Sequence, residues 1–167
     1  RQFPGHWEGD LIKGAGNASA VGTLVERTSR LVMLVKLPDF KPASAANVLQ
    51  GFTDKLLSIA QPMRQSMTYD QGREMALHKQ LSLNTGMAVY FCDPHSPWQR
   101  GSNENMNGLV RQYLPKGTDL SVYSQEQLDA IADEINNRPR KGLGVRSPLA
   151  VYRELLINSP QHSTLIH

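Results

Sequence analysis

Three segments typical of β-strands follow one another at the start of the chain, and this order constrains the fold more than any other feature. Residues 7–13, 20–27 and 31–37 are short runs rich in Val, Leu and Ile. The breaks between them contain Gly14, Gly16 and the stretch 28–30, and they are too short to carry a crossover connection. The three segments therefore predict an antiparallel meander.

Helical and strand patterns alternate in the rest of the chain. The expected elements are, in order, a helix over 42–59, a strand over 65–69, a helix over 74–84 that Gly86 ends, a strand over 87–92, and helices over 102–114, 125–136 and 148–156. A strand, a helix and a strand of these lengths predict a parallel crossover unit. The order βββαβαβ followed by helices predicts the α/β class, with a mixed five-stranded sheet flanked by helices.

Composition fits one soluble globular domain. The chain has 167 residues, of which 40% are hydrophobic and 20% are charged. Its single cysteine, Cys92, cannot form an internal disulfide, which favours a reducing compartment. No apolar run is long enough to span a membrane, and residues 1–9 lack the apolar core of a signal peptide. We expect a cytoplasmic domain over 1–157, a disordered tail over 158–167, and, because the chain begins with arginine, a longer parent protein.

The distribution of charge points to one basic loop. Net charge is +3 and the isoelectric point is near 9.1, which is compatible with nucleic-acid binding. Residues 136–146 contain four cations, no acid, and the proline and glycines of a loop. Arg138, Arg140 and Lys141 are the candidates for contacts with DNA phosphates, although a merely solvated loop explains the pattern equally well.

Three carboxylates stand in or beside regular elements. Asp10 interrupts the first strand segment, Asp70 directly follows the strand over 65–69, and Glu104 lies near the start of the helix over 102–114. Each alone could be an edge-strand charge, a turn residue or a helix-capping acid. Together they could hold magnesium, which prefers oxygen ligands, and a pair of such ions can promote phosphoryl transfer.

The chain resembles the catalytic core of bacterial insertion-sequence transposases, in particular the insertion-sequence-thirty family. The segments that carry the resemblance are Trp7-Glu8-Gly9-Asp10, Thr23-Leu24-Val25-Glu26-Arg27, Tyr69-Asp70-Gln71-Gly72, Ser96-Pro97-Trp98-Gln99-Arg100-Gly101-Ser102-Asn103-Glu104-Asn105 and Asn136-Asn137-Arg138-Pro139-Arg140-Lys141. The resemblance covers about residues 5 to 153 and implies a ribonuclease H-like fold, shared with retroviral-type integrases. Carried over by position, Asp10, Asp70 and Glu104 match the catalytic, metal-binding Asp-Asp-Glu triad.

The resemblance also implies a reaction, a cofactor and partners. The reaction is metal-dependent DNA strand cleavage followed by strand transfer, in which a 3′-hydroxyl attacks target DNA. The cofactor is Mg²⁺ or Mn²⁺, with two ions when DNA is bound. The partners are the transposon ends, the target DNA and further copies of the chain, in the bacterial cytoplasm at the nucleoid and not at a membrane. The helix-turn-helix region that precedes such cores is missing from this sequence.

Side chains near the triad are expected to support it. Residues 104, 107 and 111 share one helical face, so Asn107 and Arg111 should flank the metal site. Arg111 is expected to contact a DNA phosphate, with an internal ion pair or a solvated position as the alternative. Weaker candidates for DNA contacts are Arg100 and Lys116. His95 could orient a water molecule or contact DNA, although a loop histidine without such a role is more common.

Two other functions remain compatible with these residues. A metal-dependent nuclease of the same fold would cut DNA without joining it, and only the reaction products distinguish the two enzymes. A non-catalytic DNA-binding or assembly module from a defective element belongs to a different class. The intact triad weighs against that second alternative.

Overall fold

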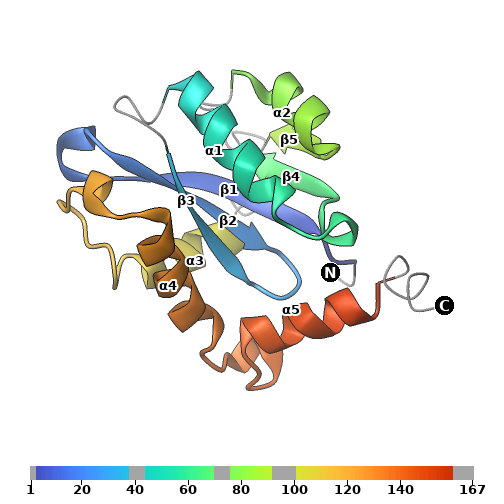
Figure 1. Ribbon diagram of the computed structural model, residues 1–167. Helices are drawn as coiled ribbons and strands as arrows, with labels where there is room; N and C mark the ends of the chain where they lie inside the picture. The colour runs from blue at the N-terminus through green and yellow to red at the C-terminus, as the bar shows by residue number, and fades with distance from the viewer. Residues whose placement is uncertain (1–2, 38–43, 70–75, 92–100, 160–167) are drawn as a thin grey trace.

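The computed structural model has a five-stranded mixed sheet in the order β3-β2-β1-β4-β5 (Figure 1). It describes residues 3–37, 44–69, 76–91 and 101–159, without the side chains of 101–104. The strands are β1 (His6–Lys13), β2 (Ala20–Glu26), β3 (Val32–Lys36), β4 (Ser66–Tyr69) and β5 (Ala88–Phe91). The predicted five-stranded mixed sheet is confirmed, as is the predicted order of strands along the sequence.

Strand pairing follows the directions that the connection lengths predict. β1 pairs with β2, and β2 with β3, in antiparallel orientation, which confirms the meander. β4 pairs in parallel with both β1 and β5, which confirms the crossover unit. In this register Asp10 stands opposite Thr23 on β2, and Gly9 stands opposite Tyr69 at the end of β4.

Five helices accompany the sheet in the described ranges. They are α1 (Ala45–Leu57), α2 (His78–Thr85), α3 (Gly101–Val110), α4 (Gln125–Asn136) and α5 (Pro148–Ile157). α1 begins after Ser44, whose hydroxyl accepts a hydrogen bond from the Asn47 amide. The helix predicted over 102–114 instead ends at Val110, because the amides of Gln112 and Tyr113 bond three residues back and tighten the chain into a turn.

The sheet separates two hydrophobic cores. Leu24 packs with Trp7 and with Phe52 of α1 on one face, whereas its neighbour Val25 packs with Val110 of α3 on the other. This division follows from the strand geometry, since successive side chains point to opposite faces. The second core also contains Ile12, two residues beyond Asp10. Asp10 therefore lies on the face that α3 and α4 cover.

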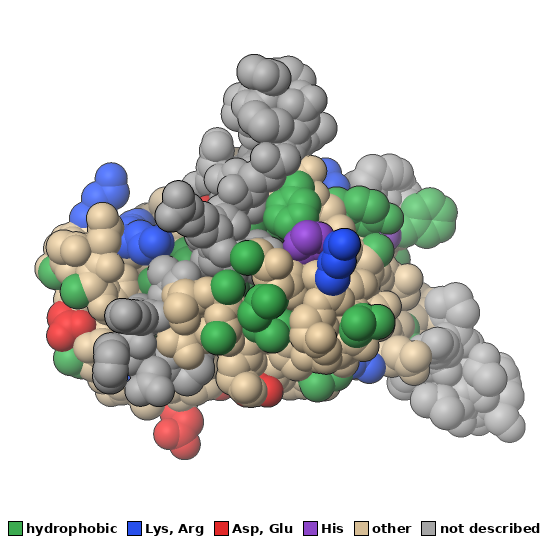
Figure 2. All heavy atoms as spheres, turned by 90° about the horizontal axis from the view of Figure 1, so that it is seen from above, with side chains coloured by type: hydrophobic (Ala, Val, Ile, Leu, Met, Phe, Trp, Pro, Cys, Tyr) green, Lys and Arg blue, Asp and Glu red, His purple; other side chains and the backbone are tan. Residues whose placement is uncertain are grey.

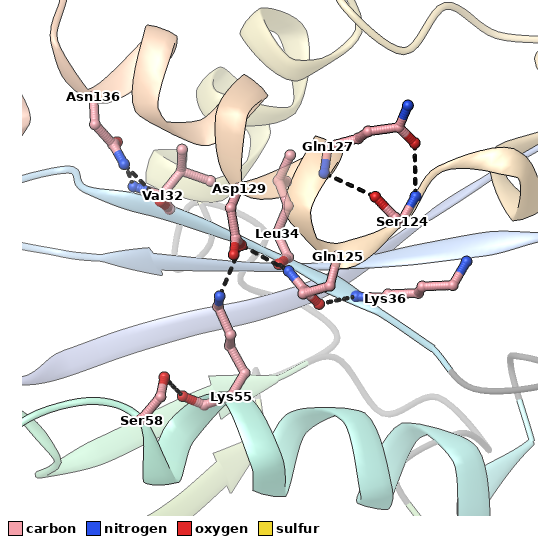
Figure 3. Close-up of polar contacts among 10 residues, drawn as sticks. All are labelled: Val32, Leu34, Lys36, Lys55, Ser58, Ser124, Gln125, Gln127, Asp129 and Asn136. Carbon is pink, nitrogen blue, oxygen red and sulfur yellow. Dashed lines mark hydrogen bonds and ion pairs between the residues drawn. The ribbon is translucent and has the colours of Figure 1, made fainter.

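Side chains of α4 close the open edge of β3 (Figure 3). The Asn136 Nδ2 donates to the Val32 carbonyl at 2.8 Å, and its Oδ1 accepts from the Val32 amide at 2.9 Å. The Gln125 amide similarly donates to the Leu34 carbonyl at 2.7 Å and accepts from the Lys36 amide at 2.8 Å. Two side-chain amides thus take the place of a neighbouring strand, which protects an edge that would otherwise pair with other chains.

Exposed hydrophobic side chains are scattered over the surface. Figure 2 looks onto the side of the molecule that carries α1 and α2, where such side chains lie among polar ones. They include Leu57 on α1 and Leu83 on α2. Single exposed apolar residues of this kind are normal on the surface of a folded protein. Of the helices in the described ranges, none combines the length and the apolar composition that a membrane span requires.

Tyr152 gives the fold an expected sensitivity to alkaline pH. Its ring meets the edge of Trp7, and burial together with the negative charge of Glu26 raises the pKa of its hydroxyl. The neutral hydroxyl contributes stability that is fully present below the unfolded-state pKa of about 10 and is lost as pH rises above it. We expect the free energy of unfolding, measured with urea, to fall above pH 10. The fall should be smaller in Tyr152→Phe, and it should be unchanged in Tyr90→Phe, because Tyr90 is exposed.

Candidate active site between strand β1 and helix α3

Asp10 is held in place by its neighbours on the sheet. Its Oδ1 accepts a hydrogen bond from the Leu11 amide at 2.8 Å, and the Thr23 hydroxyl donates to its backbone carbonyl at 3.4 Å. The side chain is half-buried, so water or a ligand can still reach it. An aspartate inside a strand is uncommon, and its position on the α3 face brings it beside a second polar side chain.

That second side chain is Asn107 of α3. Its Nδ2 donates to the Asp10 Oδ2 at 3.2 Å, across 97 residues of sequence. Its Oδ1 is buried and finds no hydrogen-bond partner among the described residues. A buried acceptor without a donor costs about 1–3 kcal/mol, so a bound group that supplies one would be stabilised here. The hydration shell of a divalent cation bound to Asp10 is such a donor, and the site therefore fits a metal.

The other two predicted ligands lie at the limit of the described residues. Glu104 belongs to α3, three residues before Asn107, and its side chain is outside the described part. Asp70 follows Tyr69 in the sequence and lies outside the described ranges, as do His95 and Arg100. No group of three candidate metal ligands occurs among the described residues. Because two members of the triad are not among those residues, the triad stays a prediction.

Arg111 links the end of α3 to the end of β1. Its Nη2 donates to the Lys13 carbonyl at 2.9 Å, and its Nη1 donates to the Leu114 carbonyl at 3.3 Å. These bonds satisfy one backbone oxygen at the end of β1 and one in the turn after α3, a role that sequence reasoning did not anticipate. The contact between Arg111 and a DNA phosphate stays a prediction. Lys116, the other candidate beyond α3, is exposed.

Glu8 is a buried carboxylate that sequence reasoning did not single out. It lies two residues before Asp10, on the same face of β1, and pairs with Arg27 at 3.3 Å. The signal was present, because alternate positions of a strand share a face. The ion pair joins β1 to the turn after β2.

The predicted basic loop follows α4 and gains an unexpected neighbour. The Arg138 guanidinium lies over the Tyr113 ring, 5.4 Å from its centroid, and donates to the Tyr113 hydroxyl. Partial burial and the nearby charges of Arg30 and Arg138 lower the pKa of Arg140. Arg30 belongs to the turn between β2 and β3, and only the fold brings it to this loop. Lys141 is exposed.

Comparison with known proteins identifies a consistent set of relatives. Residues 1–97 match the profile of a family described as "Integrase core domain". The transposase for insertion sequence element IS1086 of Cupriavidus metallidurans is 70% identical over 158 residues, which are 95% of this chain and 46% of the relative. The transposase InsI for IS30A of Escherichia coli is 50% identical over 148 residues, or 89% of this chain and 38% of the relative. The chain thus spans less than half the length of these curated relatives.

A solved structure supports the fold. The catalytic core domain of BIV integrase aligns with a TM-score of 0.62 at 19% identity, covering 90% of this chain and 94% of that one. At this identity the likeness is informative about fold alone. It confirms the predicted ribonuclease H-like architecture, and the curated relatives confirm the predicted resemblance to insertion-sequence transposases.

Proposed function

The chain belongs to the integrase core domain family, and from this premise we propose that it is the part of a transposase that cuts and joins DNA strands. The observation that carries the proposal is the contact between Asp10 and Asn107, where a carboxylate meets a buried oxygen without a donor. If this pair had only a structural role, the free-energy cost of burying the Asn107 Oδ1 without a donor would not be offset. A site for cations and DNA gives that oxygen a partner.

Asp10, Asp70 and Glu104 would together hold the divalent cations, Mg²⁺ or Mn²⁺, two of them when DNA is bound. Chain connectivity supports this set. Tyr69, just before Asp70, pairs with Gly9, just before Asp10, and adjacent strands lie about 4.8 Å apart. Glu104 lies one helical turn before Asn107 on α3. When bound, the cations supply Lewis acidity that activates the attacking oxygen and stabilises the leaving one.

The protein's own contribution is to position the reacting groups. The Leu11 amide and Asn107 fix both oxygens of Asp10, so the carboxylate needs little reorganisation before it binds a ligand. The Asn107 Oδ1 is left to accept a hydrogen bond from a water molecule or from a hydroxyl of DNA. The same geometry serves water in strand cleavage and a 3′-hydroxyl in strand transfer, because both nucleophiles attack a phosphodiester in line.

The assembly around this core is part of the proposal. Joining two transposon ends to a target requires at least two copies of the chain, acting with DNA at the bacterial nucleoid. A helix-turn-helix region in the rest of the protein would select the ends. Without it, binding should be dominated by phosphate contacts and should weaken steeply as salt increases.

Anomalous diffraction from crystals soaked in Mn²⁺ tests the metal site directly. We expect a peak within ligand distance of Asp10, and its loss in an Asp70→Asn crystal. Ordered carboxylates lying far apart, with no peak at high Mn²⁺, would contradict the proposal. The products of the reaction then separate strand transfer from simple nuclease activity, and a chain that binds metal and DNA without cutting would be an assembly module.

Asn107→Ala tests the supporting side chain. Removing the amide frees Asp10 and deletes the Oδ1 acceptor, so we expect activity to fall about 10- to 100-fold, as for other residues that orient a metal ligand. The matched control is Asn105→Ala, at an exposed position of the same helix. Plasmid nicking at increasing Mg²⁺ should show a higher metal requirement for Asn107→Ala alone. Equal activity of the two variants would rule out the role.

A further inference from the structure

Two loops far apart in sequence meet beside the end of α4. One is the turn between β2 and β3, which contains Arg30, and the other is the loop that contains Arg140 and Gly142. The Arg30 Nη1 lies 2.8 Å from the point where a Cβ on Gly142 would stand, so the guanidinium packs directly against this glycine. The Arg140 amide donates to the Arg146 carbonyl at 2.9 Å and closes the second loop. The fold thereby holds three arginines together: Arg30, Arg138 and Arg140.

No acid neutralises this arginine cluster within the described residues. Arg138 donates only to the neutral groups of Gln112 and Tyr113. The Arg140 Nη1 is buried and has no hydrogen-bond partner there, and the Arg30 side chain makes no hydrogen bond or ion pair. Elsewhere in the described residues, Arg27 is paired with Glu8 and Arg146 with Glu154. A partly buried donor surrounded by like charges is stabilised only when an anion joins it.

The backbone at Arg30 is a second, independent sign. Its φ is +63°, in the left-handed region that favours glycine. The residue closes the turn through a bond from its amide to the Glu26 carbonyl, which glycine would form equally well. The arginine side chain makes no contact that offsets this strain through hydrogen bonds or ion pairs in the described structure. Hydrogen bonds and ion pairs among the described residues therefore give no reason for arginine at this position.

We propose that Arg30, Arg138 and Arg140 form a binding site for a phosphate group of the DNA backbone. The inference rests on the proposed function, since it assumes that the chain acts on DNA, and it adds a specific contact away from Asp10. A guanidinium group can bind both non-bridging oxygens of a phosphodiester through paired N–H groups, and the positive charge of the cluster attracts this anion.

The arginine cluster is connected to β1 and α3, the elements that hold Asp10. This connection favours DNA over an acidic protein as the ligand of the cluster. The turn joins β1 through the bond from the Arg27 amide to the His6 carbonyl, and Tyr113 follows α3, the helix that contacts Asp10. Glu26, at the start of the turn, pairs with Trp7, three residues from Asp10. The cluster would hold a DNA phosphate other than the scissile one.

Fluorescence anisotropy of a labelled DNA duplex with the 167-residue chain tests the site. We expect Arg30→Gly and Arg140→Gln each to bind about tenfold more weakly at 0.1 M salt, with a salt slope reduced by about one. Arg153→Gln, at an exposed position of α5 outside the cluster, is the matched control and should bind normally. Arg30→Gly should also melt about 2 °C higher, because glycine relieves the strained backbone. That rise separates lost binding from lost folding.

The outcomes also separate this inference from the proposed function. Arg30→Gly and Arg140→Gln that bind DNA like the control would overturn the phosphate site, while Asp10→Asn that binds DNA but does not cut it would leave the function intact. If the two variants lost affinity for polyglutamate but kept their affinity for DNA, the cluster would instead be a binding site for an acidic protein. A wild-type chain without any affinity for DNA would overturn both proposals.

Discussion

Asp10→Asn is expected to reduce both strand cleavage and strand transfer by at least about a thousand-fold. The substitution removes the negative charge that would hold a divalent cation, and such an ion contributes several kcal/mol of transition-state stabilisation. The shape of the side chain hardly changes. An asparagine can accept from either the Leu11 amide or Asn107, but its NH₂ group faces the other donor, which costs about 1 kcal/mol of stability. The effect on activity should therefore greatly exceed the effect on folding.

A supercoiled plasmid and a labelled oligonucleotide measure both reactions. Nicking of the plasmid reports cleavage, and transfer of the label to the plasmid reports joining. Asp54→Asn is the control, because Asp54 is an exposed acid of α1 that accepts a hydrogen bond from Gln50 of the same helix. Wild-type rates for Asp10→Asn, with an unchanged melting temperature, would remove Asp10 from the catalytic site and leave α3 without a chemical role there.

The order of elements was predictable because it depends on local patterns. Runs of Val, Leu and Ile separated by glycine identify the meander before any tertiary contact is known. Ser44, Gly86 and Ser147 mark helix boundaries through capping chemistry that acts within a few residues. The end of α3 at Val110 was missed, because the apolar pattern continues to Leu114 while the hydrogen bonding changes to a turn.

The site was predictable only in part. Some of its features follow from local helical spacing, whereas others depend on contacts between residues far apart in the sequence. Helical spacing placed Asn107 on the face of Glu104, and the structure adds the bond to Asp10 that spacing alone cannot give. Arg30 looked like an ordinary turn residue, and nothing local links it to Gly142, 112 positions later. The left-handed conformation of Arg30 is likewise invisible in sequence, because arginine does not mark such positions. Long-range packing decides which cations cluster.

The closure of β3 by α4 leads to the second large expectation, for Asn136→Asp. Asn136 is buried and uses both halves of its amide, donating to the Val32 carbonyl and accepting from the Val32 amide. A carboxylate keeps the acceptor but places a second oxygen, negative at pH 7, against the Val32 carbonyl in place of the donor. Losing this buried donor and burying a charge in its place costs about 3–5 kcal/mol, so we expect the free energy of unfolding to fall by about that amount at pH 7.

Urea unfolding of Asn136→Asp and Asn137→Asp measures this cost with a neighbour as control. Asn137 is exposed and donates only to the Asp133 carbonyl, so its substitution should cost no more than about 1 kcal/mol. The loss in Asn136→Asp should shrink on acidification, because a protonated carboxyl can donate to Val32 as the amide does. Equal losses in the two variants would mean that α4 does not close the edge. Partners of this domain would then be free to add a strand to β3, a mode of association that the paired amides of α4 exclude.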